Sequence, residues 1–131
     1  MSKLPRLLLQ GIDSLYVSYF FDPSSSLIDW DTLFFKQQEL KRSKRRDGEE
    51  YQLGNTAFLL HRGGRNRYSF VLSNRDFTIC LSEGMSPCCY VQFMSEGLWA
   101  HGPEALLAKF DDWAASVGLI ATRLPKVARV D

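Results

Sequence analysis

Short apolar runs separated by turn residues fill the middle of the chain, between positions 56 and 94. Residues 56–61, 67–72 and 77–81 are rich in aromatic and β-branched side chains, and a fourth run at 88–94 continues the pattern. Gly, Asn, Ser or Pro clusters divide these runs at short, even intervals. This spacing is typical of antiparallel strands joined by tight turns. We therefore predict a meander, with its first turn at Gly63 and Gly64.

Two further strands are predicted near the ends of the chain. Residues 14–21 carry apolar side chains on both alternating faces, which is typical of a strand with neighbours on each side. Residues 126–131 follow Pro125, and simple alternation puts Val127, Arg129 and Asp131 on one face with Ala128 and Val130 on the other. Residues 51–53 are at most a short strand, and residues 97–102 are read as a short additional one.

Two stretches have helical periodicity. The first runs from about Leu27 to Lys44, and its predicted apolar face consists of Leu27, Trp30, Phe34 and Leu40, with Leu33 alongside. The second opens at Gly102 and Pro103 and places Gly118 as its left-handed C-terminal cap. Its apolar stripe comprises Leu106, Phe110, Trp113, Ala114 and Val117.

Together these elements predict an α+β fold in one domain, residues 1–131. We expect a mostly antiparallel sheet of five to seven strands, with two helices packed on one face. The pattern leaves open whether the first and last strands are neighbours. If they are, Asp13 and Asp131 approach one another.

Composition fits this picture: 45% of the residues are hydrophobic and 24% are charged, as in an ordinary globular protein. No apolar run approaches the length needed to cross a membrane. The three cysteines, Cys80, Cys88 and Cys89, are an odd number without metal-ligand spacing. Free thiols of this kind indicate a reducing compartment, so we expect a cytoplasmic protein without membrane association.

Positive charge is concentrated in one part of the chain, although the net charge is only +1. Positions 36 to 75 hold ten Lys or Arg residues and four Asp or Glu residues. Such a cluster can attract a polyanion, and a flexible Gly-Gly turn lets a backbone approach phosphates closely. Helix capping and solvated turns are the structural alternatives. With an arginine of the last strand, the candidate DNA-binding residues are Lys41, Arg42, Lys44, Arg45, Arg46, Arg62, Arg65, Arg67, Arg75 and Arg129.

Motifs for small-molecule catalysis are absent from the sequence. There is no Gly-rich phosphate loop, nucleophile elbow or His-Glu-x-x-His pattern. The two histidines have no Cys or His cluster around them, which argues against zinc. We interpret His61 as a strand-end residue and His101 as a helix-end residue.

Both ends of the chain resemble one family. Residues 11–19, Gly-Ile-Asp-Ser-Leu-Tyr-Val-Ser-Tyr, resemble the opening strand of the rolling-circle replication initiation proteins of phages and small plasmids. Residues 118–131, which end in Pro-Lys-Val-Ala-Arg-Val-Asp, are similar to that family's lead-in to an Arg-x-Asp strand. The two anchors lie in the expected order, so the resemblance covers nearly the whole chain.

The resemblance implies a DNA nicking and joining enzyme, in which a tyrosine attacks a phosphodiester and acidic residues hold a divalent metal, Mg or Mn. Only Asp131 matches as a metal ligand, and no catalytic residue is assigned within the chain. Its five tyrosines are upstream of the expected nucleophile and are interpreted as sheet aromatics. One carboxylate seldom holds a hard cation. We therefore expect the N-terminal, DNA-binding domain of a longer initiator, inactive by itself.

A non-catalytic α+β interaction domain is the alternative. In that case the basic residues are solvated surface, and an exposed sheet edge or the last strand pairs with another chain, for example as a homodimer. A small complete enzyme is less well supported, because no acid–base or nucleophile pair is visible.

Overall fold

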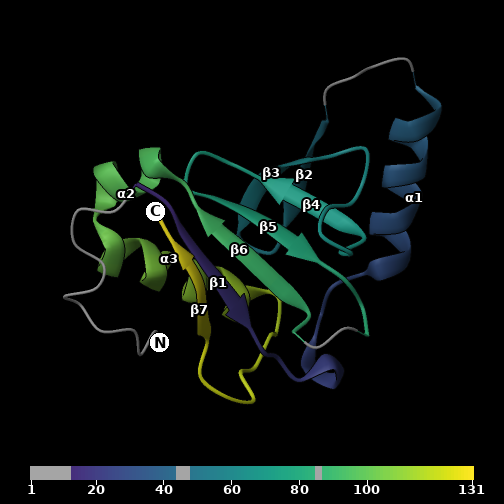
Figure 1. Ribbon diagram of the computed structural model, residues 1–131. Helices are drawn as coiled ribbons and strands as arrows, with labels where there is room; N and C mark the ends of the chain where they lie inside the picture. Colours follow the sequence, from purple (N-terminus) through teal and green to yellow (C-terminus); the bar gives the residue numbers. More distant parts are fainter. Residues whose placement is uncertain (1–12, 44–47, 85–86) are drawn as a thin grey trace.

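The computed structural model describes residues 13–43, 48–84 and 87–131, and in these ranges a seven-stranded antiparallel sheet is combined with three helices (Figure 1). The predicted α+β class is confirmed. A short 3-10 turn, η2 (Pro23–Ser25), follows the first strand. The elements in chain order are β1 (Leu15–Tyr19), α1 (Trp30–Arg42), β2 (Glu49–Leu53), β3 (Thr56–Leu60), β4 (Phe70–Ser73), β5 (Phe77–Leu81), β6 (Cys89–Phe93), α2 (Ser95–His101), α3 (Pro103–Ser116) and β7 (Lys126–Val130).

The strand order is β2-β3-β4-β5-β6-β1-β7. Strands β3 to β6 form the predicted meander, and β2 adds a full strand to it where at most a short one was predicted. β1 then inserts between β6 and β7. β1 thus has a partner on each side, as its two apolar faces predicted. The first and last strands are neighbours: the Asp13 amide donates to the Asp131 carbonyl at 2.7 Å, so these residues meet through their backbones.

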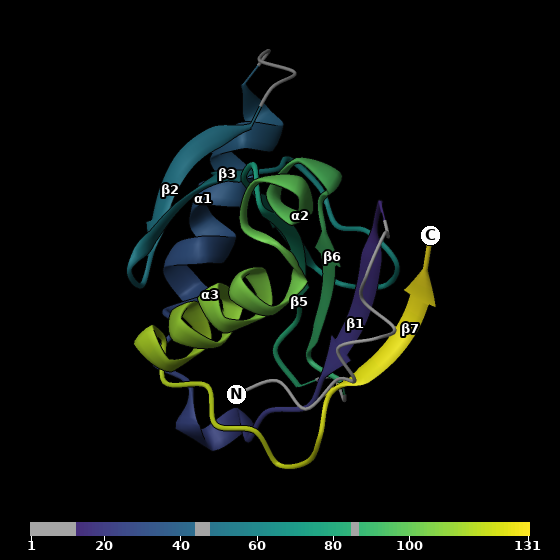
Figure 2. The same cartoon turned by 90° about the vertical axis from the view of Figure 1, so that its left-hand side faces the viewer.

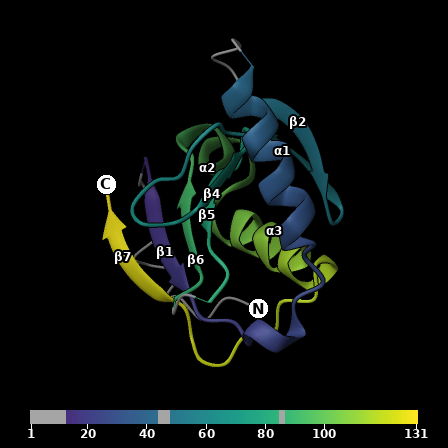
Figure 3. The same ribbon diagram turned by 90° about the vertical axis from the view of Figure 1, so that its right-hand side faces the viewer.

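The helices lie on one side of the sheet, and among the described residues the opposite side carries no helix (Figures 2 and 3). α3 buries its predicted stripe, and Phe110 at its centre packs edge-on against Phe77 and Phe93 of the sheet. The indole of Trp113 donates to the Leu53 carbonyl at 3.0 Å, which ties α3 to β2. Gly118 follows α3 with φ 74°, so the predicted left-handed cap is confirmed.

The first helix is shorter than predicted, and its buried face is different. Asp29 caps it by accepting a hydrogen bond from the Thr32 amide at 3.0 Å, so Leu27 lies before the helix and is 77% exposed. Phe34 is 56% exposed as well. The face toward the core instead includes Gln37, whose amide donates to the Ser69 carbonyl at 2.7 Å. Gln37 is polar but occupies a core-facing position of the helix, so the spacing of apolar residues alone did not identify the buried face.

A third helix, α2, replaces the additional strand predicted at residues 97–102. It begins at Ser95, directly after β6, with the acidic Glu96 in its first turn. Gly97 is buried there, and a Cβ on it would lie 2.8 Å from the Asp76 Cα. The glycine therefore lets α2 pack closely against the turn that contains Asp76. The short apolar run around it has no strand partner in the described sheet.

Candidate nucleic-acid interface

The helix-free face of the sheet is turned toward the viewer in Figure 1, and it carries a hollow. The connection between β3 and β4 extends over this face (Figures 2 and 3), and its residues Arg65, Asn66 and Tyr68 line one part of the hollow. Its volume is about 530 Å³, within the size range of ligand sites. It is lined by Tyr16, Arg65, Asn66, Tyr68, Thr78, Cys80, Tyr90, Gln92 and Arg129. We call this hollow the open-face pocket.

A row of three tyrosines forms one side of the open-face pocket. The ring centroids of Tyr16 and Tyr90 are 6.0 Å apart with planes inclined by 23°, and those of Tyr90 and Tyr68 are 6.3 Å apart with an angle of 18°. Tyr16 and Tyr90 come from β1 and β6, and Tyr68 comes from the β3–β4 connection. The Tyr68 hydroxyl donates to the Pro87 carbonyl at 3.0 Å, which fixes this ring. Three near-parallel rings from separate segments form a stacking surface.

The tight turn of the β3–β4 connection lies at Asn66 and Arg67, and not at the predicted Gly63 and Gly64. Arg65 and Tyr68 exchange two backbone hydrogen bonds, of 3.0 and 2.9 Å, around it. Asn66 and Arg67 have φ of 53° and 72°, as a type I′ hairpin turn requires. Gly64 serves another purpose: a Cβ there would lie 2.1 Å from the Tyr68 carbonyl oxygen. The glycine thus permits the chain to fold back onto itself.

Arg129 reaches this face because β7 contains a bulge. Tyr16 pairs with Arg129 and Val17 pairs with Val127, so Ala128 has no partner in the register. The extra residue breaks the predicted alternation. Val127 packs against the core, whereas Arg129 turns to the open face and lies over the Tyr16 ring at 4.4 Å from its centroid. Its guanidinium also donates to the Tyr16 hydroxyl at 3.2 Å.

Asp131, the predicted metal ligand, binds Arg129. Its carboxylate accepts hydrogen bonds from Nε and Nη2 of that arginine at 2.9 and 2.7 Å. This pairing is also the main reason why the pKa of Arg129 is raised. Among residues 13–43, 48–84 and 87–131, no three His, Cys, Asp or Glu side chains are grouped so that they could hold a metal. In this structure the Asp131 carboxylate is therefore bound to an arginine, and its role as a metal ligand stays a prediction.

The remaining predicted DNA-binding residues are divided among three places. Lys41 and Arg42 end α1, and Arg62 donates to the Lys41 carbonyl at 3.4 Å, which brings the β3–β4 connection to this helix end. Arg67 is exposed in the tight turn. Arg75 lies elsewhere, bound to Glu96 of α2 at 2.8 Å. Three more predicted DNA-binding residues, Lys44, Arg45 and Arg46, lie outside the described residues.

Electrostatics favour neutral tyrosines in the open-face pocket. Burial raises the pKa of Tyr68 to about 12, and it also raises the pKa of Tyr90. Burial likewise raises the pKa of the Cys80 thiol beneath them. An attacking phenolate needs a lowered pKa or an adjacent base. These side chains are therefore suited to stacking and hydrogen bonding, in keeping with their interpretation as aromatics of the sheet.

A second hollow, of about 280 Å³, lies beside α2 and contains paired charges. The buried Asp76 carboxylate binds Lys109 of α3 and approaches His101 Nε2 at 3.3 Å. His101 is the last residue of α2, the helix-end position that we predicted. These contacts join both helices to the β4–β5 turn, and their charges are used within the fold.

The clustered positive charge in the sequence pointed to the arginines, but not to the polar and aromatic lining of the open-face pocket. Thr78, Tyr90 and Gln92 alternate with core residues along β5 and β6. That alternation was a usable signal, because one face of each strand is covered by helices and the other is not. No comparable signal placed Asn66 in the pocket, because its location depends on the type of turn that the β3–β4 connection adopts.

No protein-family model matches the chain, and neither a curated protein nor a solved structure is detectably similar to it. In the part of the chain that the structure describes, no helix is both long enough and apolar enough to cross a membrane.

Proposed function

We propose that this chain is a DNA-binding domain that holds single-stranded DNA on the helix-free face of its sheet. The observation that carries the proposal is the tyrosine row between Arg65 and Arg129 in the open-face pocket. Aromatic rings stack on the bases of a single strand, and each such contact contributes about 1–3 kcal/mol. Tyr16 and Tyr90 are partly exposed for this purpose, whereas Tyr68 is buried. A paired duplex conceals its bases, so it lacks this contribution.

Charge supports the same assignment. Arg65 and Arg129 line the pocket from the β3–β4 connection and from β7. Arginine binds phosphate through a planar fork of donors and also stacks on aromatic rings. Lys41, Arg42 and Arg62 form a second basic group at the end of α1, where the β3–β4 connection meets the helix. The two groups extend the binding surface for the phosphate backbone beyond the pocket.

The resemblance to rolling-circle replication initiators supports a wider role for such a domain. In that role it would hold the origin strand for a nicking and joining reaction in the cytoplasm. When bound, the divalent metal, Mg or Mn, would polarise the phosphoryl oxygens. Because Asp131 is the one residue that the resemblance matches to a metal ligand, no step of that reaction is assigned to the described residues.

Fluorescence anisotropy with labelled oligonucleotides tests the proposal. We expect single-stranded DNA to bind more tightly than duplex DNA of the same sequence, with an affinity that falls as salt increases. Arg65→Gln should weaken binding and lower the salt dependence by about one phosphate contact. Arg75→Gln is the matched control, because Arg75 is bound to Glu96 away from the pocket. Absence of binding at low salt, or tighter binding of RNA, would show the DNA assignment to be wrong.

The alternative function, a protein-interaction domain, would use the edge strand β7. All five of its residues are partly or fully exposed, and it ends the strand order. The bulge at Ala128 interrupts the regular pairing on this strand, however, and bulges of this kind discourage edge-to-edge association. Light scattering that shows a homodimer, unchanged by DNA, would favour the alternative.

A further inference from the structure

We propose that the open-face pocket reads one unpaired adenine, and that Gln92 is the residue that recognises it. This inference rests on the proposed binding of single-stranded DNA and adds a base preference to it. It follows from three features: the position of Gln92 at the floor of the pocket, the hairpin that covers it, and the chemistry of its amide.

Gln92 lies in the middle of the pocket floor. In the register of the sheet it is opposite Tyr16 of β1 on one side and Thr78 of β5 on the other. In the part of the chain that the structure describes, its side-chain amide makes no hydrogen bond. A primary amide can make several hydrogen bonds, and this one is partly exposed in the pocket. The position therefore suits a ligand with matching donors and acceptors.

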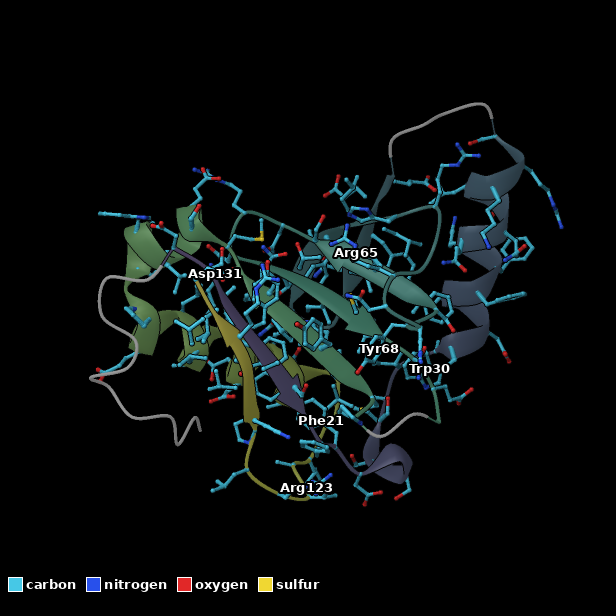
Figure 4. All side chains as sticks on the ribbon, viewed as in Figure 1. Phe21, Trp30, Arg65, Tyr68, Arg123 and Asp131 are labelled. Atoms are coloured by element: carbon cyan, nitrogen blue, oxygen red, sulfur yellow. The ribbon has the colours of Figure 1, made fainter. Side chains whose placement is uncertain are left out.

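The β3–β4 hairpin lies over this floor. Arg65, Asn66 and Tyr68 all line the same pocket, and Figure 4 shows Arg65 and Tyr68 across the sheet from Asp131 at the end of β7. The hairpin is held by the backbone bonds around Asn66 and Arg67 and by the bond from the Tyr68 hydroxyl. A base turned away from its strand can therefore enter the pocket and rest against the tyrosine row.

The polar groups of the floor match adenine better than thymine. A glutamine amide can donate to N7 and accept from the exocyclic amine of adenine at the same time, and this bidentate pair discriminates against other bases. Thr78 is 7% exposed, and its hydroxyl has only a weak contact with the Met94 sulfur at 3.5 Å. That hydroxyl is available as donor or acceptor at the base edge. Arg65 and Arg129 at the rim bind the flanking phosphates.

Anisotropy titrations with three oligonucleotides test this inference. The first contains thymine only, the second has one central adenine, and the third has a central abasic position. We expect the adenine oligonucleotide to bind about tenfold more tightly than the other two. Gln92→Leu should abolish this difference, so that the variant binds the adenine and thymine oligonucleotides with equal affinity.

Gln52→Leu is the matched control, since Gln52 lies on β2 and donates to the Gly54 carbonyl at 3.0 Å. Circular dichroism melting of each variant separates a lost contact from a lost fold. Equal affinity for all three oligonucleotides, or a preference for adenine that survives Gln92→Leu, would overturn the inference. Each of those results leaves DNA binding itself intact, whereas failure to bind any of the three oligonucleotides would contradict the proposed function.

Discussion

The guanidinium of Arg129 lies over the ring of Tyr16, 4.4 Å from its centroid, and also donates two hydrogen bonds to the carboxylate of Asp131. The two stacked residues are 113 positions apart in the chain. They meet because β1 and β7 are neighbours, and because the bulge at Ala128 turns the arginine toward the open face. This pair joins the charge of the last strand to the tyrosine row.

Substitution of Arg129 separates stacking from charge. Arg129→Lys keeps the positive charge but loses the planar guanidinium over Tyr16. We therefore expect weaker binding of single-stranded DNA with an unchanged salt dependence. Arg129→Gln removes the charge as well, and should also lower the salt dependence by about one phosphate contact. Salt titrations followed by anisotropy check both. An Arg129→Lys variant that binds single-stranded DNA as tightly as the original protein would argue against a stacking role.

Arg67→Gly should make the domain more stable. Arg67 has φ 72° in the tight turn, a conformation that favours glycine, and Asn-Gly is a preferred pair for this turn type. Relief of this strain exceeds the added flexibility of the unfolded chain, for a net gain of about 0.5–1 kcal/mol in the free energy of unfolding. Urea denaturation measures the gain. An unchanged or lower midpoint would mean that the turn is not strained at this residue.

Phe110 should be the most sensitive aromatic position of α3. It is fully buried, and its ring contacts those of Tyr19, Phe77, Phe93 and Trp113 at centroid distances of 4.4 to 5.8 Å. Phe110→Ala leaves a cavity and should cost about 3–5 kcal/mol. Phe34→Ala is the control, with an expected change within about 0.5 kcal/mol because Phe34 is exposed. A large loss at Phe34 in urea denaturation would instead support the helix face predicted from the sequence.

Acid should destabilise the fold through His61. Burial, followed by the charge of Arg65, lowers the pKa of His61 below 6.5, and Nε2 lies 2.7 Å from the Ser73 hydroxyl. The unfolded chain then takes up the proton at a higher pH than the folded chain does. The free energy of unfolding therefore decreases as the pH falls below about 6.5 toward the folded pKa.

Urea denaturation at about pH 7.5 and about pH 5.5 measures this loss. His61→Gln should show a smaller decrease over the same interval, because glutamine does not titrate. A decrease equal to that of the original protein would assign the pH dependence to other groups. An NMR titration of the histidine ring protons gives the pKa of His61 independently.

Local patterns in the sequence were sufficient for most of the elements. Alternating side chains and turn residues predicted the meander, and the spacing of apolar residues before Gly118 predicted α3 with its cap. These features depend on residues a few positions apart, whose side-chain directions follow from the backbone period. The same reasoning gave the α+β class, but it missed α2, whose glycine serves a contact with a distant turn.

The candidate site was decided by contacts between distant segments. Sequence alone gave no strand order, and only that order brings Tyr16, Gln92 and Arg129 onto neighbouring strands. The bulge at Ala128 and the turn at Asn66 and Arg67 then set which side chains face the pocket. Backbone pairing over such separations depends on the whole sheet, and one inserted residue exchanges the two faces of a strand. The sequence thus determined the elements and most of their buried faces, whereas the tertiary structure assembled the pocket.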